Sequence, residues 1–280
     1  MNNSEWDNNA FKRYEQVITG LDITFHKVFL PLWKEVVNQL PQPLKENVLE
    51  VGCGTGVLSK QLSYKVKKIV CIEPSANMID IAKKHNQEIS NIEFHQSSID
   101  EFHTKELFTT CISHMAFHNI SDITNAFRRV KGLLKPNGLF IFSIPHPCFF
   151  HFYKNIELHS FNYNDIESYE LEFTISLDRR PLPNKITYFH RRLSDYVNEL
   201  SKNGFSVVGM KEPYPSPEIM IKYPEKWEYP RYILISASTN LTPRSSPHLF
   251  LYLTFALPFA LCLSNGDLER GIFPAVLENA

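Results

Sequence analysis

The residues best suited to bind a ligand form a glycine-rich segment that follows the chain's first buried strand pattern. Glu50 is followed by Gly52, Gly54 and Gly56, with one residue between each. Glycines at this spacing let the backbone turn sharply and approach a ligand closely, because they carry no Cβ. A helical pattern begins directly after the turn, so the first N–H groups of that helix are exposed. The pattern predicts a ligand site at the carboxyl edge of an open sheet.

Two classes of cofactor use such a turn, and the glycine spacing separates them. In a dinucleotide-binding turn the third glycine lies three residues after the second, whereas Gly54 and Gly56 are only two positions apart. Glu50 also places a carboxylate at the strand tip, which suits an ammonium or sulfonium group and repels a pyrophosphate. The spacing therefore favours a positively charged nucleoside. An NAD(P)-dependent oxidoreductase and a non-catalytic cofactor-binding module remain the alternatives.

A second acidic residue stands where the next strand is expected to end. Glu73 closes the apolar run that precedes Pro74. A carboxylate at this strand tip can accept hydrogen bonds from both hydroxyls of a ribose. Nicotinamide enzymes use the same contact, so Glu73 predicts a nucleoside ligand without choosing between the two classes.

Taken together, these segments resemble the class I S-adenosylmethionine-dependent methyltransferases, especially the small-molecule branch called methyltransferase type 11. The resemblance extends from about Asn47 to Ala237. It rests on the glycine turn, the end of the second strand and the turn before the fifth strand, which read Val48-Leu49-Glu50-Val51-Gly52-Cys53-Gly54-Thr55-Gly56, Ile72-Glu73-Pro74-Ser75 and Leu133-Leu134-Lys135-Pro136-Asn137-Gly138-Leu139-Phe140. The resemblance implies S-adenosyl-L-methionine as cofactor and methyl transfer to an O, N or C atom of a small, apolar or aromatic metabolite.

The resemblance also implies positions around the cofactor. Glu50 would lie near the methionine moiety, and Gly52 to Gly56 would line the cofactor. Met78 would contact the adenine or ribose, with a core position at helical spacing as the alternative. Tyr14 and the N-terminal helices would fold over the cofactor as a lid, or Tyr14 would only pack.

Two further strand ends are implied to contact the cofactor. After the third strand the family usually has an acid for the adenine amino group, but this chain has Ser98 and Ile99 there. Ser98 is expected to supply a weaker hydrogen bond, and Ile99 its backbone. Ser113 and His114 fall at the tip of the expected fourth strand, where the family lines the methionine side of the cofactor.

Three histidines stand where a methyl acceptor is expected to lie. Transfer from a sulfonium needs a general base only if the acceptor holds its proton at neutral pH, and histidine, with an unperturbed pKa of ~6.5, suits that role. His146 is the first candidate, because prolines on both sides make its backbone rigid. His190 is the second, with a structural or substrate-covering role as its alternative, and His118 is the remaining histidine. For any of the three, the alternative is a structural histidine that only forms hydrogen bonds.

The elements that must position these residues follow an alternating pattern from Asn47 onward. Short apolar runs alternate with amphipathic helices, which predicts an α/β protein with a doubly wound, mostly parallel seven-stranded sheet. The resemblance implies that this sheet is the Rossmann-like methyltransferase fold. The expected strands are 48–51, 68–73, 92–94, 109–113, 139–144, 205–210 and 232–237.

The chain is predicted to divide into three regions. Residues 1–45 form an N-terminal helical lid, and residues 46–238 form the S-adenosylmethionine-binding domain. Within that domain the aromatic-rich segment 149–190 is predicted to contain an antiparallel hairpin and to cover the substrate. Its aromatic side chains are expected to form either an acceptor pocket or the segment's own core. Residues 239–280 are an apolar tail to which the sequence assigns no role.

Composition limits the partners. A formal net charge of −1 over 280 residues argues against a nucleic-acid partner, because phosphate binding needs a basic excess. Five scattered cysteines show no metal-site spacing and suit a reducing compartment. The apolar run 249–263 contains Pro258 and is shorter than the ~20 residues of a membrane-spanning helix. The sequence therefore predicts a cytoplasmic protein that needs no metal, and the resemblance implies that it acts on a small molecule.

Overall fold

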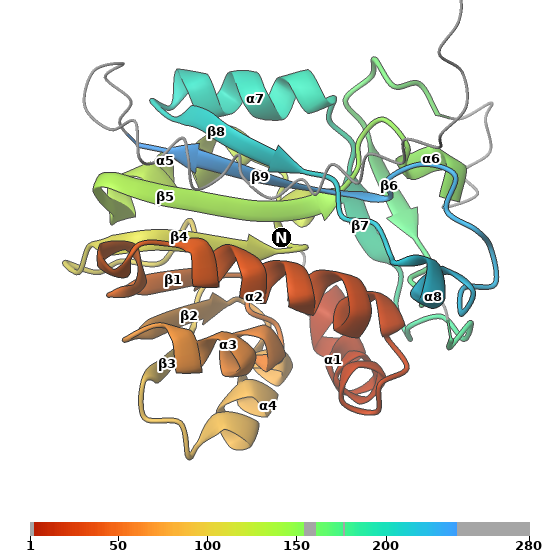
Figure 1. Ribbon diagram of the computed structural model, residues 1–280, viewed down its shortest axis with the longest axis horizontal. Helices are drawn as coiled ribbons and strands as arrows, with labels where there is room; N and C mark the ends of the chain where they lie inside the picture. Colours follow the sequence, from red (N-terminus) through yellow and green to blue (C-terminus); the bar gives the residue numbers. More distant parts are fainter. Residues whose placement is uncertain (1–2, 154–160, 176, 240–280) are drawn as a thin grey trace, which may run out of the picture.

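A seven-stranded sheet forms the centre of the protein in the computed structural model, which describes residues 3–153, 161–175 and 177–239 (Figure 1). The strand order is β3–β2–β1–β4–β5–β9–β8. β9 runs antiparallel to both neighbours, and the other neighbouring pairs are parallel. The strands are β1 (Val48–Val51), β2 (Ile69–Glu73), β3 (Ile92–Gln96), β4 (Phe108–His114), β5 (Leu134–Pro145), β8 (Ser206–Lys211) and β9 (Tyr232–Ser238). The predicted α/β fold with a mostly parallel seven-stranded sheet is confirmed.

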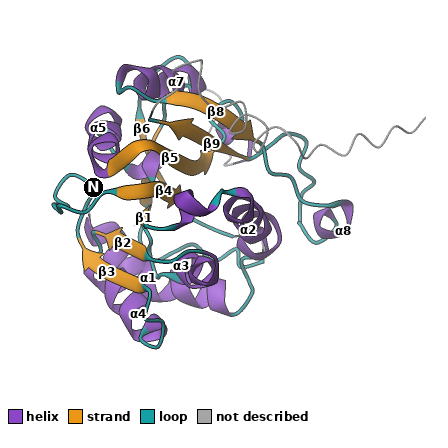
Figure 2. Ribbon diagram, turned by 60° about the vertical axis from the view of Figure 1, so that its left-hand side comes forward, coloured by secondary structure: helices purple, strands orange, loops and turns teal. Residues whose placement is uncertain are grey.

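Helices cover both faces of this sheet (Figure 2). Phe140 and Phe142 of β5 pack with α5 and α7 on one face, whereas Ile141 packs with α2 and α3 on the other. Successive side chains of a strand point to opposite faces, so a central strand covered on both sides reads as a continuous apolar run. The helices of these two layers are α2 (Leu30–Gln39), α3 (Val57–Leu62), α4 (Ala76–Asn86), α5 (Ile123–Leu133) and α7 (Leu193–Lys202).

β5 begins earlier than the sequence predicts. The turn expected at 135–138 lies inside β5, because Leu134 already pairs with Phe108 of β4. The register of that pairing then shifts between Phe108 and Thr110, and Asn137 takes a φ of +61°. Residues 135–138 therefore form an irregularity within β5, which already begins at Leu134.

The N-terminal region is helical, as predicted. It contains α1 (Asn3–Ile18), the π-helical turn η1 (Phe25–Phe29) and then α2. Pro31 lies in the first turn of α2, directly after η1, so the chain is helical on both sides of it. α2 ends at Gln39, two residues before Pro41. Figure 1 shows α1 beyond the carboxyl ends of the parallel strands.

The predicted antiparallel hairpin is present as a separate two-stranded sheet of β6 (Ser168–Leu171) and β7 (Ile186–Phe189). Its described aromatic side chains largely pack on one another, as Phe150 does on Tyr188 with ring centroids 3.8 Å apart. Phe161 similarly contacts His190 at 4.7 Å. This part of the segment forms a small aromatic core of its own.

Within the described residues, no helix has the length and apolarity to cross a membrane. The apolar tail expected from residue 239 lies outside the described residues, apart from Thr239.

Gly56, at the N-terminus of α3, lies too close to its neighbours to accept a side chain without strain. Its φ is +72°, and a Cβ there would lie 3.0 Å from Ala82 Cβ, Asn86 Nδ2 and Phe94 Cε1. Gly56→Ala should lower the free energy of unfolding by about 2–4 kcal/mol, from left-handed strain and overpacking together. Urea unfolding followed by circular dichroism measures this change.

Gly20 supplies a matched control, because its φ is +79° and nothing lies within 4 Å of the position of a Cβ. Gly20→Ala should cost only the backbone strain, about 1–2 kcal/mol. Equal losses for the two variants would contradict the assigned contact of Gly56 with α4 and β3.

Candidate functional site

A cavity of about 670 Å³ opens at the carboxyl edge of the parallel strands. Its floor is the glycine turn after β1, the end of β2 and the end of β4. Its walls come from three segments distant in sequence: α1 with η1, the stretch 172–175 after β6, and the stretch 223–225 after α8 (Pro217–Met220). The sequence predicted a site at this edge, where the ends of parallel strands bring ligand-binding loops together.

Gly52 and Gly54 line the cavity, but they do so for different reasons. A Cβ on Gly52 would lie 2.4 Å from Ala116 Cβ, so this glycine lets the turn touch the loop after β4. At Gly54 a Cβ would meet only Met78 Sδ, at 3.6 Å, so the space above it is open. Gly56 does not line the cavity. It lies close to Ala82 and Asn86 of α4 and so packs the turn against that helix.

Glu73 joins the glycine turn to the end of β2. Its carboxylate accepts hydrogen bonds from the backbone N–H groups of Gly54 and Ser75, each at 3.0 Å. The side chain is buried and lines the cavity, and burial raises its pKa to about 7. Carboxylate oxygens have further lone pairs, so Glu73 can accept additional hydrogen bonds from a ligand.

Glu50 is a second buried carboxylate in the same cavity. It accepts a 2.5 Å hydrogen bond from the Ser59 hydroxyl and a weak one from the Cys71 thiol. Burial above all, and to a smaller extent the nearby Glu73, raise the pKa of Glu50 to about 7. Among the described residues no cationic side chain pairs with Glu50. A cation bound in the cavity would favour its charged form.

The N-terminal helix contributes other residues than the one expected. Trp6, Arg13 and Val17 of α1 line the cavity, whereas the Tyr14 ring stacks on His85 of α4 with centroids 4.5 Å apart. Trp6, Arg13 and Val17 share one helical face, since residues seven and four positions apart lie on the same side. That periodicity was the signal in the sequence that could have identified them.

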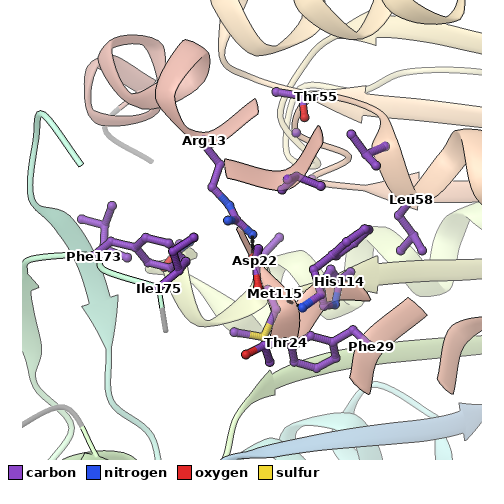
Figure 3. A pocket seen from close by; sticks show the side chains of 18 of the residues that line it. Arg13, Asp22, Thr24, Phe29, Thr55, Leu58, His114, Met115, Phe173 and Ile175 are labelled. Atoms are coloured by element: carbon purple, nitrogen blue, oxygen red, sulfur yellow. Dashed lines mark hydrogen bonds and ion pairs between the residues drawn. The ribbon is translucent and has the colours of Figure 1, made fainter. Parts of the chain in front are cut away.

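α1 is held over the cavity by polar contacts on several sides. Asp7 accepts hydrogen bonds from the Ser75 hydroxyl at 2.7 Å and the Asn77 N–H at 3.1 Å, at the start of α4. Toward the hairpin, Glu5 accepts hydrogen bonds from the N–H and hydroxyl of Thr187. Arg13 pairs with Asp22 at 2.6 Å (Figure 3).

Besides Tyr14 and Gly56, three more of the expected cofactor contacts lie outside the cavity lining. Ser98 bonds its own turn, with its hydroxyl 3.1 Å from the carboxylate of Glu101. Ile99 is buried in the core, and its carbonyl accepts from Arg129. The Ser113 hydroxyl donates to the Val51 carbonyl at 2.8 Å and so links β4 to the glycine turn. Of the cofactor residues expected from the sequence, the cavity brings together Glu50, Gly52, Gly54, Glu73 and Met78.

The two histidines preferred as bases also lie outside the lining. His146 Nε2 lies 2.8 Å from Glu212 Oε1, and its Nδ1 accepts from the Cys148 N–H at 3.3 Å, so both ring nitrogens are occupied. His190 is fully buried, with Nε2 3.1 Å from the Tyr163 carbonyl, and burial lowers its pKa. The expectation that either residue acts as a base gains no support from this geometry.

Other polar side chains line the same cavity. His118 and Asn119 reach it from the turn η4 (Phe117–Asn119), and His114 reaches it from the end of β4. Arg13 and Asp22 enter from the N-terminal region (Figure 3). His118 and His114 were expected near the site from the sequence. The Arg13–Asp22 pair was not, because both residues precede the region of alternating strands and helices.

Comparison with known proteins agrees with the geometry. Residues 49–142 match a family model described as a methyltransferase domain. Over these residues the chain is similar to methyltransferase domains, and the solved structures described below share its fold. An uncharacterized methyltransferase of Oceanobacillus iheyensis is 31% identical over 132 residues, which cover 46% of this chain and 60% of the relative. A ubiquinone biosynthesis O-methyltransferase of Bradyrhizobium diazoefficiens is 29% identical over 97 residues, covering 34% and 38%.

This chain spans only 60% and 38% of the lengths of these two relatives. Solved structures have a similar fold over a larger part of this chain. A Listeria monocytogenes protein assigned as an S-adenosylmethionine-dependent methyltransferase gives a TM-score of 0.61 at 24% identity, over 75% of this chain and 96% of that one. A Mesorhizobium loti S-adenosylmethionine-dependent methyltransferase gives 0.55 at 21%, over 74% and 96%. The oxidoreductase alternative is not favoured.

The raised pKa of Glu50 predicts a pH dependence of stability. Between pH 4.5 and about 7 the folded protein keeps a proton that the unfolded chain has already lost. The free energy of unfolding is therefore expected to fall as pH rises through this range, by about 2 kcal/mol for Glu50 alone. Urea unfolding at pH 5 and pH 7.5 measures the slope.

Glu50→Gln imitates the protonated carboxyl and should flatten this part of the pH profile. Glu46→Gln is the matched control, since Glu46 is more exposed and its pKa is lowered by Lys67. An unchanged slope in Glu50→Gln would show that Glu50 does not hold a proton at neutral pH.

Proposed function

We propose that this chain transfers a methyl group from S-adenosylmethionine to an oxygen, nitrogen or carbon atom of a small, apolar or aromatic metabolite. The observation that carries the proposal is the pair of buried carboxylates, Glu50 and Glu73, that face one cavity beside a glycine turn. Both have a pKa of about 7 because burial disfavours their charge. A cationic nucleoside would favour the charged form of both groups.

The cavity residues fit this cofactor. Glu73 would accept hydrogen bonds from the ribose hydroxyls, beside those it accepts from Gly54 and Ser75. Met78 and the open face of Gly54 would contact the nucleoside, since a Cβ at Gly54 would fill that space. Glu50 would lie nearest the ammonium of the methionine moiety, where its charge is most favourable.

S-adenosylmethionine supplies a methyl group that its sulfonium has already activated. The chain then has to hold the acceptor in line and keep water out. Trp6 and Val17 of α1 close the cavity on one side, while Phe173 and Ile175 close it on another. We propose that residues 1–45 serve as a lid and that the segment 149–190 serves as the substrate cover.

Several residues expected to contact the cofactor would instead hold in place the elements around the cavity. Tyr14 would fix α1 against α4, and Ser113 would fix β4 against the glycine turn. Ser98 and Ile99 would support the loop after β3. A small-molecule acceptor, rather than a nucleic acid, and the cytoplasmic location expected from the scattered cysteines belong to this proposal as well.

Ligand binding tests the cofactor. S-adenosylhomocysteine at a hundred times its Kd should stabilise the protein by about 2.7 kcal/mol, while NAD should not. Gly54→Val should abolish this stabilisation, because the valine side chain would fill the space that the nucleoside needs. The protein itself has room for it, since a Cβ at this position would contact only Met78 Sδ, at 3.6 Å. Thermal unfolding with and without each ligand measures both effects. Stabilisation by NAD alone would contradict the proposal.

Transfer of labelled methyl groups tests the reaction. With S-adenosylmethionine carrying a tritiated methyl, the protein should label a small-molecule fraction of a metabolite extract, and Gly54→Val should not. Label found only in protein or RNA would contradict the acceptor class. Binding of S-adenosylhomocysteine without any transfer would favour the non-catalytic module instead.

A further inference from the structure

The cavity is lined by an imidazole whose tautomer is fixed by its neighbours. Nδ1 of His114 accepts a hydrogen bond from the indole Nε1 of Trp33 at 3.2 Å, and the Ser143 hydroxyl lies 2.8 Å from the same nitrogen. An indole N–H can only donate. Nδ1 is therefore unprotonated, and the proton of the neutral ring lies on Nε2.

The surroundings also keep this ring neutral. The Phe29 and Phe25 rings lie 4.4 Å and 5.9 Å from it, centroid to centroid. Burial and then the positive charge of Arg13 lower the pKa of His114 to about 3, against the opposing charge of Asp22. At neutral pH His114 is thus a poor base. Its Nε2–H is a donor into the cavity, because no described residue accepts from it.

A second donor enters the same cavity from α1. The guanidinium of Arg13 pairs with Asp22 at 2.6 Å and lies 5.2 Å from the Phe173 ring centroid (Figure 3). Its remaining hydrogen bond among the described residues is a long one of 3.5 Å to Gln16 Oε1. A guanidinium has five N–H donors, so Arg13 can donate to a ligand while it stays paired with Asp22.

We propose that His114 and Arg13 together bind an anionic oxygen of the methyl acceptor, which is therefore an apolar or aromatic molecule that carries a carboxylate or an ionised hydroxyl. This inference rests on the proposed function and narrows its substrate class. Two donors without a base suit an oxygen that has already lost its proton. Phe29, Phe173 and Ile175, in the same lining, would contact the apolar body of such a molecule.

The methionine carboxylate of the cofactor is also an anionic oxygen, so the experiment must separate the two sources. Calorimetry compares S-adenosylhomocysteine with 5′-methylthioadenosine, which lacks the amino-acid part. Arg13→Gln and His114→Phe should change the affinity for each nucleoside by less than about threefold. A tenfold or larger loss for S-adenosylhomocysteine alone would assign the donor pair to the cofactor and overturn the proposal. Failure of the unchanged protein to bind either nucleoside would refute the proposed function itself.

Nitrogen NMR of histidine-labelled protein tests the donor directly. In the complex with S-adenosylhomocysteine, the His114 signal, assigned by its loss in His114→Gln, should keep the neutral Nε2–H pattern from about pH 5.5 to about pH 8. Titration of this ring near pH 6.5, or a proton on Nδ1, would overturn the proposal. Trp33→Phe removes the N–H that donates to His114 Nδ1. In this variant the proton of the neutral ring should no longer be confined to Nε2.

The same signal reports the ligand class. Benzoate added to this complex should shift the His114 Nε2–H resonance with a Kd at least tenfold lower than that of benzamide, which has the same shape without the charge. Arg13→Gln should remove this preference, and Arg13→Lys should restore part of it. Arg128→Gln, an exposed position on α5, removes the same charge and should leave the preference intact. Equal responses to the two probes, or none, would overturn the proposal.

Discussion

The carboxylate of Glu73 connects the two strand ends on which the site depends. It accepts hydrogen bonds from Gly54 in the turn after β1 and from Ser75 at the start of α4. These contacts fix the glycine turn relative to β2, and burial keeps the carboxyl away from bulk water. Hydrogen bonds to a buried carboxylate are stronger than those between neutral groups. The open face of Gly54, the position of Met78 and the approach of α1 all follow from this arrangement.

Much of the fold could be predicted from the sequence, because its periodicity reports burial directly. Helix α7 over Leu193–Lys202 and the hairpin of β6 and β7 both carry their pattern in consecutive residues. The glycine turn could be predicted for the same reason, since turn, strand and helix are adjacent in the chain. The start of β5 could not, because Leu134 pairs with β4 through a register shift that no local pattern records.

The site was predictable only where its residues come from the sheet itself. Glu50 and Glu73 end strands, so their meeting follows from parallel topology. The histidines show the opposite case: His146 and His190 follow strands, yet each ring turns to a partner outside the cavity. The direction of a side chain depends on tertiary contacts such as Glu212 and Tyr163. Arg13 and Asp22 come from the N-terminal region, and only the packing of α1 over the sheet edge makes them neighbours of β4.

The way α1 is attached has a consequence for exchange of ligands. The helix places few apolar side chains in the core, with Ala10 and Val17 buried, while Asn9, Gln16 and the contacts of Asp7 and Glu5 are polar. If the helix serves as the proposed lid, its lifting would expose little apolar surface, because water would replace each of those hydrogen bonds. The sheet and its two helix layers keep their own core throughout. A product would then leave past α1, while the sheet and its helix layers stay folded.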